Sequence, residues 1–218
     1  IMREWWKSWR LGARRVPRVV MVSDPGPDPD DVKALLISSV LHRAGSLQLV
    51  AVIVNGGGSQ VSMRAKLARR ILDSLGLHDV QVGRGSAGKE YAPQPHEYQL
   101  PGTDSVAADD GRIEDGQDLF QRCLLEADRR SLFVVCISSL RDFADQIRAD
   151  PELVVAKVQE VAIMGGLQRD DVTGSWVPDT AVNNNFDMAA AEECYRFCFE
   201  RDVPMAVVSR LAVPMLPM

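Results

Sequence analysis

Four aspartates lie close together near the start of the chain, where the apolar run Val-Val-Met-Val-Ser ends. They are Asp24, Asp28, Asp30 and Asp31, and a Pro-Gly turn follows the first of them. Carboxylates at this spacing repel one another, so the cluster needs a cation or a proton to compensate its charge. Hard oxygen ligands suit Ca²⁺ or Mg²⁺ better than zinc. This loop is therefore the first candidate for the working site.

A purely structural explanation covers only part of the cluster. Asp30 and Asp31 precede the helical pattern Val32, Leu35, Leu36, and acids are favourable in the first turn of a helix. That explanation does not account for Asp24 and Asp28 beside the Pro-Gly turn. We therefore favour a functional role, in which a bound metal lowers the pKa of a water molecule and one carboxylate takes its proton.

The elements that must position this loop alternate between apolar strands and amphipathic helices. Several strands are continuous Val/Ile runs, as expected for a sheet that is covered on both faces. The alternation predicts an α/β fold with a doubly wound, mostly parallel open sheet, Rossmann-like and three-layered. Such folds bind ligands at the carboxyl edge of the sheet. Strands are predicted at 16–23, 47–54, 80–82, 132–137, 161–164 and 205–208, and helices at 31–43, 61–75, 117–129, 140–147, 152–157 and 188–200.

Three further motifs end at the same predicted edge. Asn55 and three glycines follow the second strand, Gly165-Gly166 ends a later strand, and Asn183-Asn184-Asn185 precedes a helix with Asp187 as a plain N-cap. Each is compatible with an ordinary turn or with a ligand contact. Neither a P-loop nor a G-x-G-x-x-G motif is present, so the sequence does not support a phosphate-cradling or dinucleotide site.

Composition and charge exclude some classes of binding partner. The 218 residues carry a net charge of −5, which argues against a nucleic-acid backbone as the partner, and no apolar run reaches the length of a membrane span. Residues 1–15 form a basic, Trp-bearing extension without the features of a secretory signal, and residues 16–218 form one domain. The four cysteines have no zinc-like spacing and indicate buried thiols in a reducing compartment, which places the chain in the cytoplasm; they are Cys123, Cys136, Cys194 and Cys198.

The Gly/Pro-rich stretch 83–116, with Tyr91, His96 and Tyr98, is predicted to be a loop that closes over a ligand.

Taken together, these residues resemble the inosine/uridine-preferring nucleoside hydrolase family. That family opens with Asp-x-Asp-Pro-Gly-x-Asp-Asp, and here the loop reads Val22-Ser-Asp-Pro-Gly, then three residues where the family has one (an insertion of two), and then Asp30-Asp31. The similarity continues in the family's order over most of residues 16–210, including Val161-Ala-Ile-Met-Gly-Gly and the segment from Asn183. The usual Gly-Pro-Leu-Thr-Asn turn is replaced by Ser138-Ser-Leu-Arg-Asp.

The resemblance implies hydrolysis of the N-glycosidic bond of a ribonucleoside to ribose and free base, as in purine and pyrimidine salvage, by a water bound to Ca²⁺. By position, Asp24 is the general base and a metal ligand, Asp31 is the chelating carboxylate, and the backbone carbonyl of Ile137 is the main-chain ligand. The positions that match ribose contacts and pocket residues are Asp30 (with Asp28 as a competitor), Asn55, Met164 and Asn183.

Two alternatives remain open at this stage. The family's C-terminal part, which brings a further metal-binding Asp and a His, has no counterpart here, so this chain is expected to lack that part and a noncatalytic ribose- or nucleoside-binding homologue is the main rival. A magnesium-dependent phosphohydrolase is disfavoured because no phosphate-cradling lysine motif is present. The expected partner is a small-molecule nucleoside, and a homo-oligomer is left open.

Overall fold

The computed structural model describes residues 16–26, 29–56, 58–88, 111–209 and 212. The N-terminal extension 1–15, the competing acid Asp28, and the loop residues Tyr91, His96 and Tyr98 lie outside the described residues.

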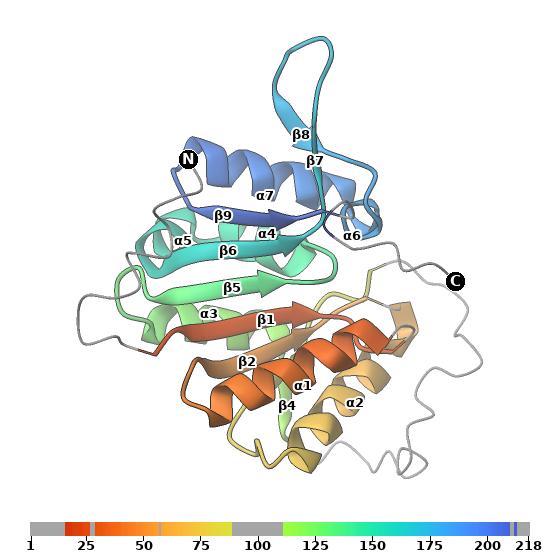
Figure 1. Cartoon of the computed structure of the whole chain (residues 1–218), viewed down its shortest axis with the longest axis vertical. Helices are drawn as coiled ribbons and strands as arrows, with labels where there is room; N and C mark the ends of the chain where they lie inside the picture. The colour runs from red at the N-terminus through yellow and green to blue at the C-terminus, as the bar shows by residue number, and fades with distance from the viewer. Residues whose placement is uncertain (1–15, 27–28, 57, 89–110, 210–211, 213–218) are drawn as a thin grey trace.

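A seven-stranded sheet forms the centre of the fold, and every neighbouring pair of its strands is parallel (Figure 1). The strand order is β4-β3-β2-β1-β5-β6-β9. This arrangement confirms the predicted doubly wound α/β class. The strands are β1 (Arg18–Ser23), β2 (Gln48–Val54), β3 (Gln81–Arg84), β4 (Ile113–Asp115), β5 (Leu132–Cys136), β6 (Val158–Met164) and β9 (Met205–Val208).

Two apolar cores lie on opposite faces of the sheet. Leu35 and Leu72 pack with Val52 in one core, whereas Phe120 and Phe143 belong to the other. The first core is covered by α1 and α2, which lie in front of the sheet in Figure 1, and the second by α3, α4, α5 and α7. The helices are α1 (Pro29–Arg43), α2 (Val61–Ser74), α3 (Gly116–Glu126), α4 (Arg141–Ala149), α5 (Pro151–Lys157), α6 (Val182–Phe186) and α7 (Met188–Glu200), and a 3-10 turn, η2 (Gly58–Gln60), precedes α2.

The strand order reverses at β1, and this reversal positions the site. The chain runs outward from β1 through β2 and β3 to β4, then returns to β5 on the other side of β1 and continues to β6 and β9. The carboxyl ends of β1 and β5 therefore border the crevice in which open α/β folds bind ligands. Four of the predicted site residues lie at this edge of the sheet: Asp24 follows β1, Asn55 follows β2, Ile137 follows β5 and Met164 ends β6.

Two features were not predicted. Strand β4 pairs with β3 inside the stretch 83–116 that we expected to lack structure, so that prediction was wrong for its last residues. The antiparallel hairpin of β7 (Leu167–Arg169) and β8 (Trp176–Pro178) projects away from the main sheet (Figure 1). Both involve three-residue strands, which are too short to show a periodicity.

The buried thiols were predicted correctly, since all four cysteines are free and buried. Among the described helices, none combines the length and the hydropathy needed to cross a bilayer.

Candidate functional site

The first turn of α1 folds back against the end of β1 and brings two of the predicted carboxylates together. The hydroxyl of Ser23 donates a hydrogen bond of 2.6 Å to Oδ1 of Asp31, and the backbone N–H of Asp24 donates to the same oxygen at 3.2 Å. Asp24 and Asp31 are only 8% and 5% exposed, whereas Asp30 is exposed. The acidic loop thus turns one pair inward and leaves Asp30 at the rim.

Burial dominates the electrostatics of this pair. Burial is the largest cause that raises the pKa of Asp24, to about 8, with the neighbouring charge of Asp31 acting in the same direction and Arg64 opposing both. Burial likewise raises the pKa of Asp31 to about 6, against the hydrogen bond from Ser23. A proton and a cation are the two ways to compensate clustered carboxylates, and a cationic side chain lies beside this pair.

The cation is Arg64, which the sequence analysis did not identify. Its side chain is fully buried, and its Nη1 donates to Oδ2 of Asp24 at 3.1 Å and to the backbone carbonyl of Asp24 at 3.2 Å. Gly56 adjoins this ion pair, since a Cβ there would lie 3.4 Å from both Arg64 Nη1 and the Asp24 Cβ. The α2 sequence did carry a signal: Arg64 precedes Leu67 and Ala68 by three and four residues, so it lies on the apolar face of the helix.

Asn183 joins two strand ends on the other side of the crevice. Its Nδ2 donates to the carbonyl oxygens of Ile137 at 3.0 Å and of Met164 at 2.9 Å. Asn183 lies on the short helix α6, which is followed by α7 with Asp187 as its N-cap, as predicted. Three of the predicted site residues are therefore in direct contact.

Asn55 makes its contacts inside the protein. Its Nδ2 donates to the backbone carbonyl of Ser139 at 3.0 Å and to Oδ2 of Asp142 at 2.7 Å, so it ties the end of β2 to the start of α4. Its Oδ1 is buried and has no hydrogen-bond partner among the described residues. This orphan acceptor is the atom of Asn55 that a ligand hydroxyl or a water molecule would satisfy.

Asp142 is the centre of a buried polar network that was also not predicted. Its carboxylate accepts hydrogen bonds from Asn55, from the backbone N–H and hydroxyl of Ser86, and from Nε2 of Gln117. Burial raises the pKa of Asp142, while the bonds from Asn55 and Ser86 lower it. Because every one of these partners is a donor, the network is matched to the ionised carboxylate. The signal in the sequence was its position in the turn where the family has an asparagine.

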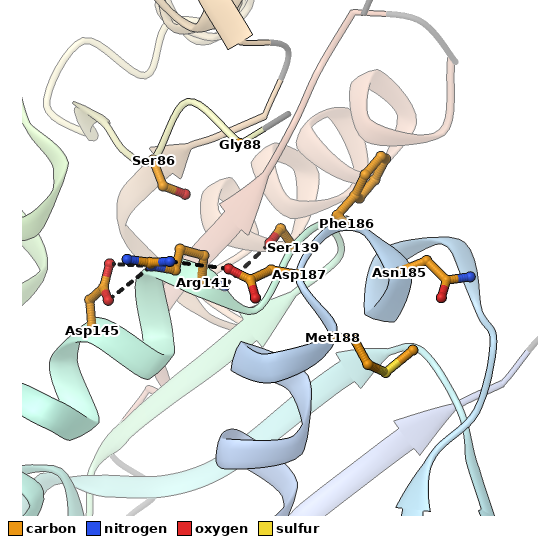
Figure 2. A pocket seen from close by; sticks show the side chains of 9 residues that line it. All are labelled: Ser86, Gly88, Ser139, Arg141, Asp145, Asn185, Phe186, Asp187 and Met188. Atoms are coloured by element: carbon orange, nitrogen blue, oxygen red, sulfur yellow. Dashed lines mark hydrogen bonds and ion pairs between the residues drawn. The ribbon is translucent and has the colours of Figure 1, made fainter. Parts of the chain in front are cut away.

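A cavity of about 600 Å³ adjoins this network (Figure 2). Ser86 lines it, and so does Ser139, whose carbonyl accepts the bond from Asn55. Arg141 lies across the cavity and forms ion pairs with Asp145 at 3.0 Å and with Asp187 at 3.2 Å (Figure 2). Two carboxylates thus face one guanidinium. The remaining lining residues are Gly88, Asn185, Phe186 and Met188.

The predicted calcium ligands do not form an ion site as they are arranged. Among the described residues, no group of three or more His, Cys, Asp or Glu side chains is placed to hold a metal ion. Arg64 engages Asp24, and Asn183 donates to the Ile137 carbonyl. Calcium takes six to eight oxygen ligands. Two carboxylates and one carbonyl, each already engaged by a hydrogen-bond donor, do not fit that requirement.

Comparison with known proteins gives a consistent picture. The sequence model of the inosine-uridine preferring nucleoside hydrolases matches residues 19–214. The type III effector protein XopQ, solved in complex with adenosine diphosphate ribose, is 30% identical, with a TM-score of 0.76 over 94% of this chain and 61% of that one. The effector protein XOO4466 is 27% identical, with a TM-score of 0.75 over 94% of this chain and 59% of that one.

A more distant structure shares the fold. The inosine-uridine preferring nucleoside hydrolase from Bacillus anthracis is 17% identical, with a TM-score of 0.67 over 93% of this chain and 68% of that one. No curated protein sequence matches this chain at a significant level. The chain spans about three fifths of the length of the two effector proteins.

Proposed function

This chain belongs to the inosine-uridine preferring nucleoside hydrolase family, and from that membership we propose that it binds a ribonucleoside at the β1–β5 crevice and hydrolyses the N-glycosidic bond. The products are ribose and a free base. The observation that carries the proposal is the convergence of the buried Asp24–Asp31 pair and the Asn183 bridge at the strand ends.

In the proposed reaction a water molecule attacks the anomeric carbon and Asp24 takes its proton. Burial raises the pKa of Asp24 to about 8, and a carboxylate with a pKa near neutrality is a stronger base than one in solvent. The C–N bond breaks as the water attacks, so the ribosyl group passes through an oxocarbenium-like state, as in O-glycoside hydrolysis, and the departing base takes up a proton from solvent. The negative charge of the acidic pair stabilises that cation.

The proposed sugar contacts combine the family resemblance with this geometry. We assign Asp30 at the rim, Asn55 through its orphan Oδ1, and Asn183 to the ribose hydroxyls. Met164 contributes its backbone carbonyl to the bridge that orients Asn183. The neighbouring cavity, with Phe186 on its wall, is assigned to the part of the ligand beyond the ribose.

Calcium is the cofactor that family membership suggests, with Asp24, Asp31 and the Ile137 carbonyl as its ligands. Of these ligands, Asp24 already pairs with Arg64 through Oδ2, and the Ile137 carbonyl already accepts a hydrogen bond from Asn183. Since the described residues do not fit the ion in their present arrangement, the proton transfer above is derived from Asp24 alone.

A second candidate, a noncatalytic ribose-binding protein, is favoured by one observation. Arg64 donates to the very carboxylate that would serve as the base, and a base in an ion pair is weakened. The complex of XopQ with adenosine diphosphate ribose supports a ribose-bearing ligand for either candidate.

Chromatographic assay of inosine and uridine solutions for free hypoxanthine and uracil separates the candidates. The hydrolase releases base at a rate proportional to protein concentration. Calorimetric titration with ribose is run in parallel on the same preparation. Ribose binding without base release would establish the binding protein instead. If the chain neither releases base nor binds ribose, the proposal is refuted.

A further inference from the structure

We propose that the Arg64 guanidinium is the built-in cation of this site, in place of a divalent metal ion, so that the acidic pair takes up a pentose without calcium. The pentose part rests on the proposed function. The metal part rests on the contacts of the assigned ligands and is tested separately.

The first support is the burial of Arg64. Its side chain is 0% exposed, so its permanent charge is removed from water and requires a fixed anion. Asp24 supplies both that anion, at 3.1 Å, and a backbone carbonyl at 3.2 Å. Release of Arg64 from Asp24 would therefore break an ion pair in which the guanidinium is fully buried.

The second support is the space around the ion pair. Gly56 adopts φ +73, and a Cβ there would contact Arg64 Nη1 and Asp24 Oδ2 at 3.4 and 3.5 Å. The β2–α2 connection thus runs beside the ion pair at the end of β1. A divalent ion on Asp24 would lie beside this fixed positive charge in a dry environment, where like charges repel most strongly.

The third support is independent of Arg64. The Ile137 carbonyl, the main-chain ligand that the family resemblance assigns to the ion, accepts a hydrogen bond from Asn183 at 3.0 Å. The Oδ1 of Asp31 accepts two hydrogen bonds, from Ser23 and from the backbone of Asp24. All three assigned ligands are therefore engaged by N–H or O–H donors of this chain, and those donors orient them without a metal.

The test is a calorimetric titration of the EDTA-treated chain with CaCl₂. Wild type is expected to show no saturable binding below about 1 mM, the weak end of protein calcium sites. Arg64→Met keeps an apolar stem and removes the charge, and it is expected to bind Ca²⁺ at least about tenfold more tightly because the carboxylates lose their counter-ion. Lys66→Met is the matched control: it removes one positive charge from the same helix, two positions on and partly exposed, and should behave like wild type.

Saturable micromolar binding to wild type that is lost in Asp24→Asn would overturn the inference, and so would a folded Arg64→Met that gains no affinity. If Arg64→Met does not fold, the melting temperature of wild type decides: no change between EDTA and CaCl₂ supports the inference, and a rise of several degrees in CaCl₂ overturns it. A ribose-induced rise in melting temperature is expected in EDTA. A rise that requires calcium contradicts the inference, whereas no rise in either buffer refutes the proposed ribose site and leaves the calcium titration to decide the role of Arg64.

Discussion

Asp31 is the residue at which the cost of burying a charge can be measured most directly. Its folded pKa, raised by burial to about 6, lies above the unfolded value of 3.8, so the folded state is favoured by protonation. Protonation of Asp31 therefore adds to the free energy of unfolding below about pH 4, and this stabilisation is lost as the pH rises through 6.

Asp31→Asn is therefore expected to match wild type near pH 4 and to be more stable by about 3 kcal/mol near pH 8. The amide oxygen can still accept the bonds from Ser23 and Asp24. Urea unfolding at the two pH values measures the difference, with Asp30→Asn at the exposed neighbouring position as the control. An advantage of wild type that grows with pH would contradict the expectation.

Asp24→Asn tests the assigned base. Loss of a general base lowers the rate of base release by about 10²–10⁴-fold. The same change leaves the buried Arg64 without its anion, and we expect the free energy of unfolding to fall by about 3 kcal/mol. Initial rates and urea unfolding are measured on the same preparation. A folded variant with the wild-type rate would remove Asp24 from the mechanism.

Sequence reasoning named some of the polar residues that the structure places at this edge of the sheet and missed others. Asp24, Asp31 and Asn183 were identified because acids and amides after apolar strands are conspicuous, and the sheet then brings them to one edge. Arg64 and Asp142 were missed because each lies within a helix, where a charged residue usually faces solvent. Only the tertiary structure shows that both are buried.

At the scale of elements, α3 begins in direct contact with the end of β3. A Cβ on Gly116 would lie 2.7–2.8 Å from backbone atoms of Arg84 and Gly85, which cannot rotate away. Gly116→Ala is expected to lower the free energy of unfolding by about 3 kcal/mol through overpacking. Leu125→Ala, at a 60% exposed position of the same helix, should change it by less than about 0.5 kcal/mol. Guanidinium unfolding compares the two, and equal effects would show that the contact is not tight.

The elements themselves were largely predictable. Strand β9 and helix α7 have the predicted bounds, and the other long elements differ by a few residues at their ends. Continuous Val/Ile runs and helical apolar spacing carry that information. The short strand β4 was not predictable, because its pairing with β3 depends on a partner that is distant in the sequence.

At the scale of the whole molecule, the sheet has a protected centre and two outer strands among the described residues. Strands β1, β2 and β5 have a parallel neighbour on each side, whereas β4 and β9 each have a single paired neighbour there. Hydrogen exchange followed by mass spectrometry should therefore show slow exchange for the central strands and fast exchange for β4 and β9. Uniform protection across the sheet would contradict this order.

The bridge made by Asn183 also decides which polarity of ligand atom the crevice recognises. Both contacts that it makes to Ile137 and Met164 use its amide nitrogen, so the group it can present outward is the carbonyl oxygen. An oxygen of this kind accepts hydrogen bonds and repels oxyanions. At the proposed ribose site we therefore expect a free sugar hydroxyl next to Asn183 to be bound, and a phosphate ester at the same position to be repelled.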